Sequence, residues 1–180
     1  TSRGSTIEIA NMQARVTQAD VMLGGGAQAY APMGAGSIRN DDGLFVELAQ
    51  RGYVQAATKA ELDAAVALPT THQLVGLFAP SHMTYVAARL PDTTEPTLTE
   101  TSLAALTVLD RDPDGAFLMI EGGRIDHGGH GRNLVNSIQE ALAFDDAIAA
   151  VHAWAQTRGN VTMIITADHG NADEMYELDK

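Results

Sequence analysis

The chain has 180 residues, of which 45% are apolar, and its formal net charge is −12. That length predicts one domain with a substantial core, and the charge argues against a nucleic-acid-binding surface, which needs clustered basic residues. A phosphate substrate is not excluded, because bound metal cations reverse the local field. The sequence has no cysteine, which excludes disulfides and thiolate metal ligands, and no apolar run is long enough to span a membrane.

The first half of the chain alternates helical patterns with short apolar runs that predict buried strands. The expected helices cover residues 7–18, 44–50 and 59–66. The expected strands cover residues 20–24, 53–57 and 74–79. Residues 80–96 contain three prolines and little periodicity, so they predict a long surface excursion.

The second half continues the alternation. A helix is expected from Thr97 or Thr99 to about Asp110, followed by a turn at residues 112–115. Two further strands, 117–120 and 161–165, are expected on either side of a long helix over 134–157 that packs across the sheet. This order indicates an α/β fold, with a largely parallel sheet and helices on both faces. Residues 1–180 are expected to form a single domain, because neither an internal repeat nor a linker divides them.

Two segments carry carboxylate and imidazole groups directly after the last two predicted strands: EGGRIDHGGH (residues 121–130) and TADHG (residues 166–170). Ligands of open α/β sheets bind at the carboxyl ends of strands, and oxygen donors combined with imidazole suit zinc and magnesium. We therefore expect five side chains to converge there as part of a metal site: Glu121, Asp126, His130, Asp168 and His169.

Each motif alone is weak evidence for a metal. Asp126 and His130 are four residues apart and would share a helix face, but the glycines between them predict a tight loop. A simpler role for Asp168 is that of N-cap to a helix that begins after a strand, where aspartate is common. Of the other histidines, His82 is expected in a surface loop and His152 on the outer side of the long helix.

EGGRIDHGGH is very similar to a signature of the alkaline phosphatases, and TADHG matches the second metal motif of that family. Five more segments resemble alkaline phosphatase sequence in the same order: ADVMLGGG, LAQRGY, VGLFAPSHM, EPTLTE and AFDDAI. The spacing between His130 and Asp168 also agrees. The resemblance covers nearly the whole chain.

Alkaline phosphatases hydrolyse phosphate monoesters with two zinc ions, one magnesium ion and a serine that forms a phosphoserine intermediate. The resemblance implies a role for each motif residue: Asp126 and His130 for one zinc, Asp168 and His169 for the other, Glu121 for magnesium, and His127 for indirect contact with the phosphate. Two zinc ions suit an in-line displacement, because they stabilise both the entering and the leaving oxygen. The resemblance also implies a homodimer and a periplasmic or secreted location.

The chain departs from the family pattern in several places. None of its serines lies in the Asp-Ser-Ala nucleophile segment, and the family's bridging aspartate, magnesium-binding threonine and phosphate-binding arginine are missing. The last zinc-ligand histidine is expected beyond Lys180. We therefore expect a fragment of a larger catalytic domain that is inactive alone. The first residues lack the apolar core of a signal peptide, so either none was made or the chain starts downstream of it.

Two other hypotheses stay open. A cofactor-independent phosphoglycerate mutase, from the same metalloenzyme superfamily, is similar over TADHGNADEM (residues 166–175), although EGGRIDHGGH fits alkaline phosphatase better. A non-catalytic module that binds metal or phosphate is favoured by the missing nucleophile.

Overall fold

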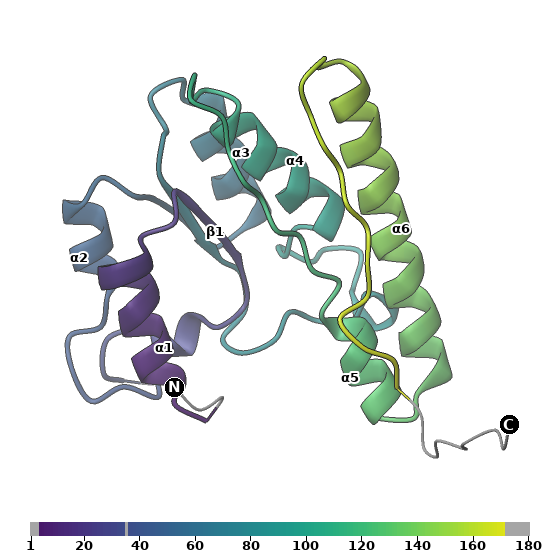
Figure 1. Ribbon diagram of the computed structural model, residues 1–180. Helices are drawn as coiled ribbons and strands as arrows, with labels where there is room; N and C mark the ends of the chain where they lie inside the picture. Colours follow the sequence, from purple (N-terminus) through teal and green to yellow (C-terminus); the bar gives the residue numbers. More distant parts are fainter. Residues whose placement is uncertain (1–3, 35, 172–180) are drawn as a thin grey trace, which may run out of the picture.

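A parallel sheet of three strands forms the centre of the protein in the computed structural model, which describes residues 4–34 and 36–171 (Figure 1). The strands are β1 (Val21–Gly24), β2 (Val54–Ala56) and β3 (Leu74–Leu77), in the order β1-β3-β2. Leu74 pairs with Val21 on one side and with Val54 on the other. These strands lie where the sequence predicts them, and the α/β class with a parallel sheet is confirmed.

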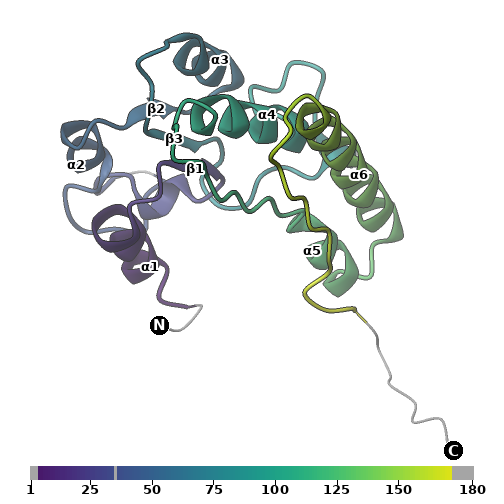
Figure 2. The ribbon, with the colours of Figure 1, turned by 45° about the horizontal axis from the view of Figure 1, so that its top comes forward.

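Helices cover both faces of the sheet, as predicted. On one face α1 (Thr6–Met12), its π-helical extension (Gln13–Thr17) and α2 (Phe45–Gln50) bury small and aliphatic side chains against Val75. On the other face α3 (Lys59–Ala67) and α4 (Leu98–Leu109) pack against Leu74. Figure 2 shows these two groups of helices on opposite sides of the strands. The two faces are distinct because successive side chains of a strand point in opposite directions.

Side-chain caps fix where several helices begin. Thr97, not Thr99, is the N-cap of α4. Its side chain accepts a hydrogen bond from the Glu100 backbone N–H, and the Glu100 carboxylate accepts one from the Thr97 backbone N–H. Asn133 caps α6 (Leu134–Gln156) by accepting from the Asn136 backbone. These caps satisfy backbone donors that have no partner within their helix.

The prediction of strands at residues 117–120 and 161–165 is wrong. Residues 117–120 and 161–165 run as extended segments outside the sheet (Figure 1). Phe117 is 91% exposed and Ile164 is 83% exposed, and no backbone group of either segment has a hydrogen-bond partner within the part of the chain that the structure describes. A strand exists only when a neighbour supplies the partner for its backbone. Their apolar composition indicates a tendency to be buried, but it does not supply that neighbour.

The prediction that the long helix packs across the strands is also wrong. Helix α6 packs mainly against α4, α5 (Arg124–His130) and a short 3-10 helix (Val86–Ala88). Ala147 is its buried residue, whereas Ile138 is 48% exposed. None of the described helices has both the length and the apolar character needed to cross a membrane.

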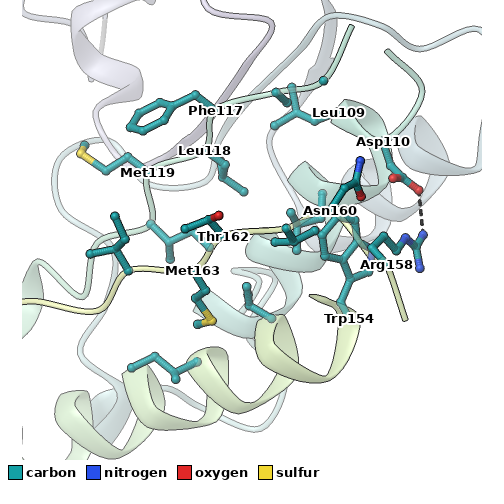
Figure 3. A pocket seen from close by; sticks show the side chains of 18 of the residues that line it. Leu109, Asp110, Phe117, Leu118, Met119, Trp154, Arg158, Asn160, Thr162 and Met163 are labelled. Atoms are coloured by element: carbon teal, nitrogen blue, oxygen red, sulfur yellow. Dashed lines mark hydrogen bonds and ion pairs between the residues drawn. The ribbon is translucent and has the colours of Figure 1, made fainter. Parts of the chain in front are cut away.

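A largely apolar groove of about 640 Å³ lies between the two extended segments, α4 and α6 (Figure 3). Side chains from both segments line it, among them Leu118 and Met163, and Trp154 of α6 adds an aromatic wall. An ion pair between Asp110 and Arg158, 2.7 Å long, lies at its edge. The predicted metal ligands do not line this groove, so it is separate from the candidate site.

Candidate metal centre

The first motif forms a short helix, α5, so the prediction of a tight loop over residues 126–130 is wrong. The two glycines of the motif, Gly128 and Gly129, lie within this helix. Their missing side chains allow close packing against neighbouring residues and do not form a turn. A Cβ on Gly128 would lie 2.8 Å from Ser137 Oγ and 2.9 Å from the Ser137 backbone nitrogen. Gly128 therefore allows α5 to approach the first turns of α6.

Replacing Gly128 by alanine is expected to destabilise the protein. Alanine favours a helix by about 1 kcal/mol over glycine, but forcing a methyl group against backbone costs about 1–3 kcal/mol. Urea denaturation of Gly128→Ala should show a lower midpoint, whereas the control Gly159→Ala, with nothing within 4 Å of the new methyl group, should not. A Gly128 variant as stable as the parent would contradict this account of the contact between the helices.

Asp126 is the centre of a group of side chains from both motifs. Its Oδ1 lies 3.4 Å from His130 Nε2, one helical turn further along α5, and 3.9 Å from His169 Nε2 in the second motif. His169 Nε2 is in turn 3.3 Å from Asp168 Oδ2. Asn171 donates a hydrogen bond of 3.0 Å to Asp126 Oδ1, which joins the end of the second segment to α5.

Glu121, the fifth predicted ligand, lies apart from this group. It is exposed, and its carboxylate lies beside Gly123 at the start of α5. Across residues 4–34 and 36–171 no ion pair or hydrogen bond links it to Asp126 or to the histidines. The structure thus brings four of the five predicted metal ligands together.

Neighbouring donors keep Asp126 ionised. The hydrogen bond from Asn171 lowers the pKa of Asp126 below its usual value, and the imidazoles of His130, His169 and His127 lower it further. Metal ligands of this type must be deprotonated. The surroundings of Asp126 therefore favour the form that binds a cation.

Two of these distances are close to the separation of neighbouring ligand atoms on a tetrahedral metal ion. Two ligand atoms that a tetrahedral zinc ion binds at about 2.0–2.1 Å lie about 3.3–3.4 Å apart. The Asp126–His130 pair, at 3.4 Å, and the Asp168–His169 pair, at 3.3 Å, both have this separation. Among the residues described, no set of three or more acidic or histidine side chains is arranged closely enough to enclose an ion. The described residues therefore offer two pairs of potential donors rather than a complete metal site.

His127 lies beside this group and contacts residues from elsewhere in the chain. Its Nδ1 is 3.1 Å from Arg124 Nη1, and its ring centroid is 4.3 Å from that of His82. Burial lowers the pKa of His82, and the nearby His127 and Arg124 lower it further. The guanidinium of Arg124 stacks on the Tyr85 ring, with Cζ 3.5 Å from the ring centroid.

Sequence reasoning missed His82 and Tyr85 because it assigned residues 80–96 to a loop without a role. That loop is fixed to the long helix by a hydrogen bond of 2.7 Å from the Val86 backbone to Glu140. The contact holds His82 and Tyr85 against α5. The spacing of Arg124 and His127, three residues apart, would have placed both on one face had the helix been recognised.

The fold and this group of side chains define an α/β protein with a carboxylate–imidazole cluster formed by two separate segments. Comparison with known proteins identifies its family. The sequence model of the alkaline phosphatase family matches residues 2–178, and the chain therefore belongs to the alkaline phosphatase family. The resemblance noted from the motifs is confirmed.

Individual relatives agree with this assignment. The chain is 30% identical to alkaline phosphatase H of Pseudomonas aeruginosa, over 88% of this chain and 38% of that protein. It is 29% identical to the alkaline phosphatase of Escherichia coli, over 90% of this chain and 39% of that protein. The feline tissue-nonspecific isozyme is 41% identical over 54% of this chain and 18% of its own length. The chain thus spans less than half the length of these relatives.

Solved structures show the same fold. The Thermus thermophilus alkaline phosphatase has a TM-score of 0.76 at 28% identity, covering 87% of this chain and 32% of that one. The enzyme of the Antarctic bacterium TAB5 has a TM-score of 0.73 at 26% identity, covering 88% of this chain and 43% of that one. A variant of the TAB5 enzyme contains bound magnesium.

Proposed function

We propose that the chain contributes part of the active site of a metal-dependent phosphomonoesterase of the alkaline phosphatase type. One observation carries the proposal: Asp126 Oδ1 lies within 3.9 Å of the Nε2 atoms of both His130 and His169, which come from two motifs far apart in the sequence. Family membership supports the phosphatase class over the phosphoglycerate mutase. Residues 172–175, which carry part of the likeness to the mutase, lie outside the described residues.

Each group of ligands has a proposed metal. Asp126 with His130 would hold one zinc ion, Asp168 with His169 the second, and Glu121 a magnesium ion. When bound, these ions would supply Lewis-acid stabilisation for the entering and leaving oxygens of a phosphoryl transfer. The magnesium in the TAB5 variant supports the presence of that metal in the family.

The protein's own residues would orient and preserve this ligand set. Asn171 holds the Asp126 carboxylate in place and keeps it charged, and α5 fixes His130 one turn away from it. His127 would act on the substrate side, contacting the phosphate group indirectly. A hydroxyl nucleophile that forms a phosphoserine would have to come from residues other than these 180, since no serine here lies in an Asp-Ser-Ala segment.

Partners and location follow from the family and are proposals as well. We expect phosphate monoesters as substrates, a homodimer as the assembly, and a periplasmic or secreted location. The 180-residue chain alone should show little or no phosphomonoesterase activity, because loss of a nucleophile leaves only a small remainder of the rate acceleration.

Enzyme assays on the protein as its gene encodes it would test the proposal. Release of phosphate from p-nitrophenyl phosphate in the presence of zinc and magnesium is the expected result, together with no isomerisation of phosphoglycerate. Isomerisation without phosphate release would instead support the mutase. Metal or phosphate binding without either reaction would support the non-catalytic module.

A further inference from the structure

We propose that Arg124 is a positioning residue that fixes His127 in one tautomer, with its proton on Nε2, so that this N–H is available to an anionic phosphate oxygen or its bridging water. The inference rests on the proposed function, in which His127 lies on the substrate side. It adds a role for Arg124 and for Tyr85, neither of which belongs to the proposed ligand set.

The chemistry of the arginine side chain decides the tautomer. A guanidinium group carries only N–H donors and no acceptor. In the 3.1 Å contact between Arg124 Nη1 and His127 Nδ1, the imidazole nitrogen must therefore accept the hydrogen bond. A neutral imidazole whose Nδ1 accepts carries its proton on Nε2. The contact thus presents His127 as a donor at Nε2.

Arg124, which fixes the tautomer of His127, is itself held in place by an aromatic neighbour. Its guanidinium lies over the face of Tyr85, with 3.5 Å between Cζ and the ring centroid, which is a close cation–π contact. Its Nε is buried and has no hydrogen-bond partner in the described part of the chain. No ion pair of Arg124 occurs among those residues either. Within the described residues no carboxylate neutralises its positive charge, which adds to the attraction for an anion near His127.

His82 limits the orientation of the His127 ring from a second direction. The two ring centroids are 4.3 Å apart and the rings are inclined at 59°. Rotation of the His127 ring would disturb this contact and the hydrogen bond to Arg124 together. Arg124 of α5 and His82 of the loop over residues 80–96 thus both contact the imidazole, and Tyr85 of the same loop contacts Arg124.

Nuclear magnetic resonance of ¹⁵N-labelled imidazoles tests the proposal without any enzyme assay. In the parent protein, long-range ¹H–¹⁵N correlations should show His127 with an unprotonated Nδ1 and a protonated Nε2. Arg124→Leu removes the donor and should convert His127 to a mixture of both tautomers. Tyr85→Phe keeps the aromatic face and should leave the tautomer unchanged. An unchanged tautomer in folded Arg124→Leu, or a protonated Nδ1 in the parent, would overturn the proposal.

Titration with inorganic phosphate tests whether His127 donates a hydrogen bond to the anion. Arg124→Leu should weaken phosphate binding by about tenfold, the expected effect of losing one well-placed hydrogen bond, and Tyr85→Phe should not. If Arg124→Leu shifts the tautomer but leaves a measurable phosphate affinity unaltered, the proposed donation to the anion is wrong. If the tautomer shifts while even the parent protein fails to bind phosphate, the positioning role is supported and the proposed function fails instead. Arg124→Met, which keeps a long side chain but has no N–H donor, serves as a second variant with the same expected outcomes should Arg124→Leu not fold.

Discussion

Replacing Asp126 by alanine is expected to abolish most zinc binding at the site that Asp126 shares with His130. The Asp126 carboxylate lies close to imidazoles of both motifs, 3.4 Å from His130 and 3.9 Å from His169. Substitution of groups that merely support a ligand costs about 10–100-fold in metal affinity, so loss of this ligand should weaken zinc by about 100-fold or more. Isothermal titration calorimetry with zinc would measure the change.

His152→Ala is the matched control for this measurement. His152 is an exposed histidine on α6, and it contacts Gln156 rather than any predicted ligand. Its replacement should leave zinc affinity and turnover unaltered. Equal losses of affinity in the two variants would mean that zinc binds to surface histidines in general and that the assignment of Asp126 is wrong.

Truncation of Leu74 is expected to cause the largest loss of stability. Leu74 is fully buried and lies in the central strand, paired with Val21 and with Val54. Removing such a side chain costs about 2–5 kcal/mol, through lost burial and the cavity that remains. Chemical denaturation of Leu74→Ala should therefore show a loss in the free energy of unfolding within this range.

An exposed aliphatic residue provides the comparison. Val46 on α2 is 66% exposed, so Val46→Ala should change the free energy of unfolding by less than about 0.5 kcal/mol. Similar losses at the two positions would show that the three-stranded sheet is not the stabilising core.

The elements that the sequence predicts well are those whose causes are local. The apolar runs of β1, β2 and β3 are short and lie between helices whose own patterns are clear. The capping box of Thr97 and Glu100 marks the start of α4 within four residues of chain. Propensity, spacing and capping act over one or two turns, and all of them can be read directly.

The elements that the sequence predicts poorly depend on neighbours. Residues 117–120 and 161–165 have the composition of strands, but no adjacent strand supplies their backbone partners in the described chain. Gly128 reads as a loop residue, yet its role is to let α5 approach Ser137 of α6. The position of His82 beside His127 depends on a loop held by a distant glutamate of α6. Such contacts leave no periodic signal in the sequence.

Within the candidate site, the sequence predicts which residues are suited to metal binding but not how they are held. The convergence of Asp126 and His130 with Asp168 and His169 follows from two motifs that approach each other in space. Asn171, which connects them, was not among the predicted site residues. Amide side chains of this kind are common in surface turns, so composition alone does not single it out.

Anomalous diffraction at the zinc absorption edge, from crystals of the protein grown with zinc, tests the central claim most directly. The account predicts one peak bonded to Asp126 and His130 and a second bonded to Asp168 and His169, each about 2.0–2.2 Å from its ligand atoms. Peaks confined to other sites, or zinc bound equally well beside His130 in crystals of Asp126→Ala, would contradict it.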